Sequence, residues 1–365
     1  ASKALSKSGF AVSKSLSVVT GASGLLGSYI TEILVQRGQR VRALARESSD
    51  VRLVEKLGVE LLRGDLADGD FAQQAIASAD VVYHCAGRIR NWGPWEDFQR
   101  GNILSTRHVV DACHRHQVRR LVHVSSLAVY GHPPGGKGEL TEAEPLGQHP
   151  WSYDYYNDSK IAAERIVEEL GDAATIVRPT WFFGPRDKAF VPRVLAALRK
   201  GAVWVIGSRQ NQLNGLYVTD LAEAVILAGE SPKAAGQAYN LCAEHGITQQ
   251  ELFDILCDGF DIPRVRRRIP LVIAHHFAHL VETVSRLAGR KDPPSISRHA
   301  LSVLARPASF SSAKARRELG WEIKVRQPEG LSKSIEWIQR GEHFDELVIA
   351  RPTSKQVHPS RKEDH

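Results

Sequence analysis

Between residues 15 and 180 the sequence alternates short apolar runs, rich in Val, Ile and Leu, with longer amphipathic stretches. The short runs read SLSVVTG, RVRALAR, VELLRGDL, DVVYHCAG, RLVHVSS and ATIVRP. Strands that alternate with helices in this way form βαβ units, which bring the strands side by side in one parallel sheet. The alternation predicts an α/β fold with a Rossmann-type, doubly wound parallel sheet.

The alternation ends after Pro179. A helix is expected at 190–200, the apolar run VWVIGS follows, and most of the last third has the spacing of helices. We therefore predict a sheet domain at 15–180, to which 214–242 returns, and a smaller, mainly helical lobe made of 181–213 and 243–345. Residues 1–14 and 346–365 are predicted to be disordered tails.

Composition excludes several classes of protein. At 365 residues and 42% hydrophobic, the chain can bury a substantial core. Its four cysteines are far apart and include no C-x-x-C pair, so neither a zinc site nor a disulfide framework is suggested, and a reducing, cytoplasmic location is expected. The formal net charge of +7 is spread along the chain without a nucleic-acid motif, which argues against DNA or RNA as a partner.

An uncharged stretch and a group of three histidines could suggest a membrane span and a metal site, respectively. The uncharged stretch 15–31 is shorter than the ~20 residues of a membrane-spanning helix and contains Gly and Ser, so membrane insertion is not expected. His275, His276 and His279 have a spacing that could suit a metal, but no pattern of cysteines or acids accompanies them. We expect these histidines to face solvent and predict no metal site.

A glycine-rich loop follows the first predicted strand. In SVVTGASGLLGSYI, Gly21, Gly24 and Gly27 stand between a strand and a helix. Gly21 allows a tight turn, Gly24 allows the backbone to approach a pyrophosphate, and Gly27 allows close contact between helix and strand. The helix N-terminus would face the anion. This context predicts a dinucleotide-binding loop.

The end of the second strand distinguishes two nicotinamide cofactors. An acid there would bind the free ribose hydroxyl of NAD, whereas an arginine would accept the extra phosphate of NADP. The sequence has Arg46, so NADP is predicted, with Arg42, Ser48 and Ser49 as further phosphate-binding candidates and NAD as the alternative. Asp65, at the end of the third strand, is expected near the adenine, although it could instead cap a helix.

The stretch YDYYNDSK contains the candidate chemistry. Of its three tyrosines, only Tyr156 has a lysine four residues on, so a helix would place Tyr156 and Lys160 on one face. A phenol with a pKa of about 10 needs a nearby cation to exchange its proton near neutral pH. A third group would hydrogen-bond the substrate oxygen, and of Ser125 and Ser126 we choose Ser126. These residues predict general acid/base chemistry.

These motifs together resemble the extended short-chain dehydrogenase/reductases over about residues 16–340. The matching segments are TGASGLLG, GDL, HCAG, GNILSTRHVVDAC, SSLAVYG, YYNDSK and RPTWFFGPRD. Further segments, from GPRDKAFVPRVLAALRKG to SSAKARRELGW, are similar to the 3β-hydroxysteroid and sterol-4α-carboxylate dehydrogenase branch. That branch commonly has an acid after the second strand, and Arg46 departs from it.

The resemblance implies roles for individual residues. Ser126 would polarise the substrate oxygen, Tyr156 would be the general acid/base, and Lys160 would lower the tyrosine pKa and bind the nicotinamide ribose. Asn102 would be structural or part of a proton relay. The complete set of cofactor-binding candidates is Gly21, Ser23, Gly24, Leu25, Leu26, Gly27, Arg46, Asp65, Leu66, Ala86, Gly87, Lys160 and Pro179.

The branch resemblance implies an oxidoreductase that transfers a hydride between nicotinamide and a secondary alcohol or ketone on a steroid-like or other apolar ring substrate. Aromatic candidates for the substrate wall are Trp92, Trp95, Tyr155 and Phe183. One alternative is a nucleotide-sugar epimerase or dehydratase, which would use the same triad but retain its cofactor. Another is a non-catalytic dinucleotide sensor. A homodimer is a further expectation from the family.

Overall fold

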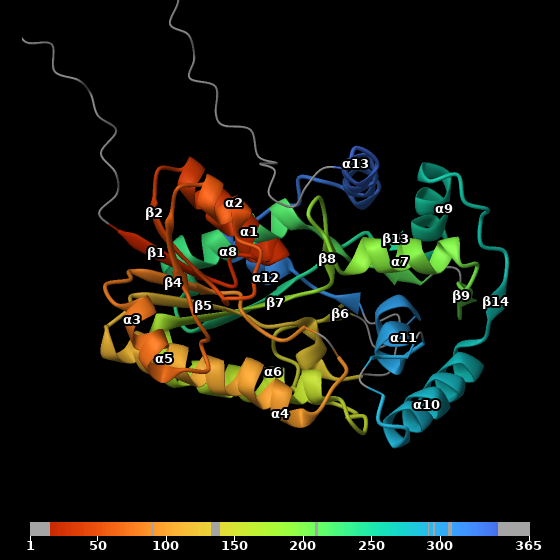
Figure 1. Ribbon diagram of the computed structural model, residues 1–365, viewed down its shortest axis with the longest axis horizontal. Coiled ribbons are helices and arrows are strands. Elements are labelled where there is room, and N and C mark those ends of the chain that lie inside the picture. The colour runs from red at the N-terminus through yellow and green to blue at the C-terminus, as the bar shows by residue number, and fades with distance from the viewer. Residues whose placement is uncertain are drawn as a thin grey trace, which may run out of the picture.

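The computed structural model describes residues 15–89, 91–132, 139–208, 211–290, 292–294, 296–305 and 309–341, so both predicted tails lie outside the described residues. Seven parallel strands form the central sheet in the order β12-β7-β5-β4-β1-β2-β3 (Figure 1). Their bounds are β1 Leu16–Thr20, β2 Arg40–Ala45, β3 Glu60–Arg63, β4 Val81–His84, β5 Arg120–Val124, β7 Ala174–Pro179 and β12 Gln237–Leu241. The strand order runs outward from β1 in both directions, which confirms the doubly wound prediction.

Helices cover both faces of this sheet (Figure 1). One face packs against α1 Leu25–Gln36, α2 Arg52–Lys56, α8 Val218–Glu230 and α12 Ala313–Leu319. The other face packs against α3 Gly69–Ile76, α5 Ser105–Arg115 and α6 Tyr155–Val167. Fully buried aliphatic side chains fill the space between the sheet and the helices on each face. Burial of each such side chain stabilises the fold by about 1.5–3 kcal/mol.

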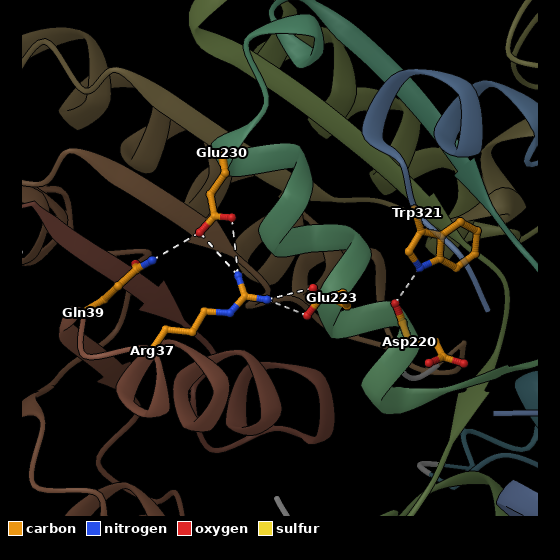
Figure 2. Close-up of polar contacts among 6 residues, drawn as sticks. All are labelled: Arg37, Gln39, Asp220, Glu223, Glu230 and Trp321. Carbon is orange, nitrogen blue, oxygen red and sulfur yellow. Dashed lines mark hydrogen bonds and ion pairs between the residues drawn. The ribbon is translucent and has the colours of Figure 1, made fainter. Parts of the chain in front are cut away.

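Polar contacts fix α8 to the segments that follow α1 and α12 (Figure 2). Arg37, which follows α1, pairs with Glu223 at 2.7 Å and with Glu230 at 3.4 Å. The indole nitrogen of buried Trp321 donates to the Asp220 carbonyl at 2.8 Å. Residues 214–242 thus contribute α8 and the edge strand β12 to the layers around the sheet.

Local sequence explains where the helices begin. Asp68 accepts hydrogen bonds from the amides of Asp70 and Phe71 and so caps α3. Thr248 and Glu251 form a reciprocal capping box at the start of α9 (Gln249–Gly259). Between β4 and β5 the chain forms three consecutive helical segments, which are α4 Trp95–Phe98, the π-helical η1 Gln99–Leu104 and α5.

The remaining elements form a mainly helical layer beyond the carboxyl ends of the strands. Its helices are α7 Phe190–Arg199, α9, α10 Leu271–Leu287, α11 Arg298–Ala305 and α13 Gln327–Gln339. Short strands join it in pairs: β6 Glu139–Leu140 with β15 Ser309–Phe310, β8 Phe182–Phe183 with β11 Leu216–Tyr217, β9 Val205–Ile206 with β14 Arg268–Ile269, and β10 Gln212–Leu213 with β13 Ile247–Thr248. The 3-10 segments are η2 Leu127–Tyr130, η3 Glu168–Ala173 and η4 Pro232–Ala234.

Helix α10 lies at the edge of this layer and packs on α11 through Ala274, Ala278 and Leu301 (Figure 1). Its opposite side exposes several large apolar residues, among them Phe277 and Leu280. None of the helices in the described ranges has the length and hydropathy needed to cross a bilayer.

Candidate active site

A cavity of about 1040 Å³ lies where the carboxyl ends of the central strands meet the helical layer. Its wall contains every predicted catalytic residue and every predicted cofactor-binding residue. A dinucleotide and a second small molecule together need an elongated space of this kind, and the switch point of a doubly wound sheet is where such ligands bind.

The glycine loop has the close contacts that the sequence implied. Gly21 has a φ of +65°, and a Cβ there would lie 2.9 Å from the amide nitrogen of Ala86. A Cβ on Gly27 would collide with the Gly21 carbonyl. Gly24 precedes α1 in an extended conformation and donates to the Gly21 carbonyl at 2.9 Å. Because only glycine fits here, the backbone and the first amides of α1 can approach an anion, so the loop fits a dinucleotide pyrophosphate.

The far end of the cavity offers basic groups. Arg46 is exposed on the cavity wall next to Ser49, whereas Arg42 is directed elsewhere, to Glu60 and to the carbonyls of Ala75 and Ala77. This geometry removes Arg42 from the phosphate-binding candidates.

Asp65 lies at the same end and does not cap α3. Its carboxylate accepts from the amide of Ala67 at 2.9 Å and pairs with Arg100 at 2.6 Å. Partial burial works to raise the pKa of this carboxyl, but those two partners lower it overall. The acid is therefore charged and already neutralised by Arg100.

Three groups, two from α6 and one from the segment after β5, line the cavity wall. Ser126 follows β5, while Tyr156 and Lys160 lie one helical turn apart on α6. The Ser126 hydroxyl lies near the Tyr156 phenol and works to lower the pKa of that phenol. Lys160 is buried, and its ammonium donates to the Val124 carbonyl at 2.8 Å. Ser125 has a buried hydroxyl that finds no partner among the described residues, so the geometry favours Ser126 as the partner of the tyrosine.

Burial sets the protonation of the tyrosine and the lysine. It raises the pKa of Tyr156, and the nearby Ser126 hydroxyl only partly offsets this, so the net lowering of this pKa that was expected from Lys160 is not seen. Burial also lowers the pKa of Lys160 to about 8, although the Glu164 carboxylate opposes the shift. Tyr156 is therefore a neutral phenol at neutral pH, ready to donate a proton, and Lys160 is close to losing its charge.

Turnover is expected to fall as the pH rises through about 8, because Lys160 then loses the charge that would stabilise a developing Tyr156 phenolate. Stability should behave differently. The pKa of Lys160 in the folded protein lies below its ordinary value of 10.5. Between these two pH values the unfolded chain therefore holds more protons, so this group increasingly favours the fold as the pH rises. The measurement is kcat/KM alongside the thermal midpoint across this range. A flat rate profile would contradict the role given to Lys160.

The Asn102 side chain forms hydrogen bonds with the loop after β4 and with α6. Its side-chain oxygen accepts from the Arg88 amide at 2.6 Å, and its nitrogen donates to the Arg88 carbonyl and, at 2.9 Å, to the Ser159 hydroxyl. These bonds tie the loop after β4 to α6. A Cβ on Gly87 in that loop would lie 3.1 Å from Asn102 and 3.5 Å from the Lys160 ammonium. Of the two roles expected for Asn102, the contacts favour the structural one.

The four aromatic residues predicted for the substrate wall lie away from the described cavity lining. Phe183 is fully buried and packs beside Trp181 in a hydrophobic cluster. Trp92 is covered by the Arg286 guanidinium, 4.4 Å above its ring. Trp95 and Tyr155 pack against each other with ring centroids 5.4 Å apart. Apolar packing accounts for these contacts, and a role in substrate binding stays a prediction.

Sequence reasoning missed the residues that do line the substrate end. His132 lies in the wall and pairs with Asp154 at 2.7 Å. His299, Ser302 and Val303 reach the cavity from one face of α11. Their i, i+3, i+4 spacing in RHALSVLA was the available signal, since it places two polar residues and one valine on the same face of the helix.

The three histidines considered as metal ligands lie on α10. His276 and His279 are exposed, whereas His275 is half-buried with its ring centroid 5.4 Å from that of Trp151. Within the described ranges, no three His, Cys, Asp or Glu side chains are grouped so that they could hold a metal ion.

The comparison with known families matches residues 17–242 to the NAD dependent epimerase/dehydratase family. The chain belongs to this family. It is therefore an enzyme of the extended short-chain dehydrogenase/reductase type that uses a nicotinamide dinucleotide, and the cavity fits that cofactor at the glycine loop.

Similar proteins from this family differ in their substrates. A 2-alkyl-3-oxoalkanoate reductase of Stenotrophomonas maltophilia is 31% identical over 87% of this chain and 97% of its own. The 3beta-hydroxysteroid-dehydrogenase/decarboxylase isoform 2 of Arabidopsis thaliana is 28% identical over 87% of this chain and 61% of its own. The crystal structure of gox2253 is 27% identical, covers 90% of this chain and 99% of its own, and superposes with a TM-score of 0.74.

Proposed function

We propose that this family member is an NADP-dependent oxidoreductase that interconverts a ketone and a secondary alcohol in a largely apolar substrate. The observation that carries the proposal is that Ser126 and the neutral phenol of Tyr156 lie together on the wall of the cavity that also contains the glycine loop. An acid beside an open cavity suits protonation of a carbonyl oxygen as it accepts a hydride.

The bound nicotinamide would supply or accept the hydride. The protein residues would handle the oxygen. Ser126 would donate a hydrogen bond to the carbonyl and orient it, and Tyr156 would donate its proton as negative charge develops on that oxygen. Lys160 lies one turn along α6 and would stabilise the resulting phenolate by its charge. In the reverse direction, the same phenolate would remove the alcohol proton.

The choice of NADP over NAD rests on Arg46. It is exposed on the cavity wall beside Ser49, in the position from which an arginine can bind a ribose phosphate. Asp65, an acid on the same cavity wall, is neutralised by Arg100. These two observations support a phosphate-bearing cofactor, and NAD stays the alternative.

Replacing Arg46 with Ala is expected to raise KM for NADP about 10- to 100-fold, which corresponds to the loss of a charge-assisted hydrogen bond worth about 1.5–3 kcal/mol. KM for NAD should change little. Arg52→Ala is the matched control, because this exposed arginine pairs with Asp50 instead. Equal increases in KM for NADP and for NAD would show that Arg46 does not bind the phosphate that distinguishes the two cofactors.

A 3-oxo acid with apolar alkyl groups is the substrate class that we propose. Two relatives, 31% and 28% identical over 87% and 86% of this chain, are named 2-alkyl-3-oxoalkanoate reductases. The substrate end of the cavity supports an apolar chain, since Trp181, Phe182, Val303 and Phe310 contribute to its wall. A steroid-like ring substrate is the second candidate, and the 28% identity to the hydroxysteroid relative favours it.

The deciding experiment follows the near-UV absorbance of reduced nicotinamide with NADP or NAD against 3-hydroxy acids, hydroxysteroids and nucleotide sugars. We expect NADP reduction with one class of secondary alcohol. The epimerase alternative would be favoured by two results together: a nucleotide sugar is altered without a net change in absorbance, and the cofactor stays bound through purification. No change with any alcohol and no altered sugar would favour the sensor.

A further inference from the structure

The imidazole of His299 packs edge-on against the ring of the candidate general acid. It projects from α11 and stands perpendicular to the Tyr156 ring, with the two ring centroids 6.1 Å apart. Both residues belong to the cavity wall. A ligand that reaches the Tyr156 hydroxyl is therefore within a few bonds of His299.

The position of His299 is fixed by its neighbours in the chain. The preceding Arg298 forms a largely buried ion pair with Glu282 of α10 at 2.7 Å, and its guanidinium also donates to the Ser152 carbonyl at 3.0 Å. At the other end of α11, the Asn211 side chain donates to the Ala305 carbonyl at 2.5 Å. The helix is held at both ends, so it presents His299 in a defined place.

The charged and titratable groups around His299 have partners of their own. His132 and Asp154 pair with each other, Asp154 also accepts from Asn157 at 2.6 Å, and Glu282 pairs with Arg298. The His299 ring makes no hydrogen bond to any residue in the described part of the chain, although it borders the cavity. Its ring nitrogens are therefore available to a ligand oxygen in the cavity.

The charge of the wall favours an anionic ligand group. Its described acids are all satisfied, since Asp65 pairs with Arg100, Asp97 pairs with Arg88, and Asp187 accepts three backbone amides. No unpaired carboxylate among the described lining residues would therefore repel an anion beside His299.

We propose that His299 binds the carboxylate of the substrate and so selects 3-oxo and 3-hydroxy acids over neutral ketones and alcohols. This inference rests on the proposed function, because it assigns the reacting oxygen to Ser126 and Tyr156. An imidazole N–H would donate to one carboxylate oxygen and hold the acid group while the neighbouring carbonyl lies at Tyr156. His299 is then a substrate-binding residue that determines specificity, and it takes no part in the proton transfer.

Carboxylate binding should also couple to the charge of the imidazole. Burial lowers the pKa of His299, with His132 acting in the same direction and Asp154 and Glu282 opposing. The empty site therefore holds a neutral ring at neutral pH. A bound carboxylate favours the imidazolium, so the preference for an acid over its ester should strengthen as the pH falls.

The test compares a 3-hydroxy acid with its methyl ester, with NADP as the oxidant. The ratio of the two kcat/KM values cancels the effect of Lys160, which acts on both substrates alike. In His299→Phe, KM for the acid is expected to rise about 10- to 100-fold, as for a lost hydrogen bond to a charged group, while kcat and the values for the ester stay close to those of the unchanged protein. The pH dependence of the ratio should disappear.

Two further variants separate binding from packing. His299→Asn retains an N–H donor and should recover part of the preference for the acid. His276→Phe replaces an exposed histidine on α10 and should leave kcat/KM unchanged for both the acid and the ester. Equal losses for acid and ester in His299→Phe would overturn the inference and indicate a role in packing against Tyr156. If the unchanged protein oxidises alcohols and esters without preferring the acid, this inference fails alone; if it oxidises no alcohol, the proposed function fails as well.

Discussion

Tyr156→Phe is expected to lower kcat/KM for the carbonyl substrate about 10²- to 10⁴-fold, the usual contribution of a positioned general acid. The change removes the hydroxyl that would donate the proton and leaves the ring in place beside His299. The dissociation constant for NADP should stay nearly unchanged, because the predicted cofactor contacts come from the glycine loop, Arg46 and Lys160. The measurements are steady-state reduction of a ketone by NADPH and a separate titration of the cofactor.

Tyr155→Phe is the matched control for this experiment. Tyr155 is adjacent in sequence and lies on the same helix, but it packs against Trp95 and Phe98, with ring centroids 5.4 and 6.0 Å away. Its hydroxyl is therefore expected to matter little for turnover. If both variants kept full activity, the proton donor would have to be another group. If both lost activity equally, the loss would come from a disturbance of α6 and not from the removal of one hydroxyl.

The sheet was predictable because its information is local and repeated. Each strand is a short apolar run, and each crossover helix has its own periodicity, so the order of elements follows from patterns that need no knowledge of distant contacts. The glycine loop was predictable for a related reason. Gly21 and Gly27 stand where a Cβ would meet backbone within the loop or in the adjoining Ala86 segment, which leaves little freedom of residue choice.

The substrate end was not predictable in the same way. Trp92 and Phe183 have the composition expected of an apolar pocket, but the same aromatic rings equally suit a core, and long-range contacts decide between the two. Trp92 donates to the Arg290 carbonyl, 198 residues away, and Phe183 packs against Tyr217. His299 reaches the cavity only because Arg298 anchors α11 to α10 and to the segment before α6. None of these partners is marked by spacing in the sequence.

Long-range contacts, which the local sequence does not reveal, also position the helix that carries Tyr156 and Lys160. Helix α6 carries Tyr156 and Lys160 on one side, while Glu164, one further turn along, is fully buried against the sheet. There it receives Arg178 of β7 in a two-pronged ion pair, with contacts of 2.7 and 3.1 Å. The remaining guanidinium nitrogen donates to the Tyr130 hydroxyl at 2.8 Å. The ion pair thus joins α6, β7 and the segment after β5, the three regions that position Ser126 and Tyr156.

Glu164→Ala is therefore expected to lower the free energy of unfolding by about 3–5 kcal/mol, because it leaves the Arg178 charge buried without a partner. Denaturant unfolding measures this loss. Glu169→Ala is the matched control, since Glu169 lies just beyond α6 in an exposed pair with Arg107 and should change stability little. The double variant Glu164→Leu with Arg178→Met should recover much of the loss, because it removes both charges together.

A second readout connects this pair to the chemistry. The Glu164 carboxylate works to raise the pKa of Lys160 against the larger, opposite effect of burial. Without Glu164, Lys160 should lose its proton at a lower pH, so the fall in turnover should begin below the value seen in the unchanged protein. Glu164→Ala and the double variant should share this shift even though their stabilities differ, because both lack the carboxylate. A shift that followed stability instead would mean that the helix had moved, and that Glu164 acts on Lys160 only through its position.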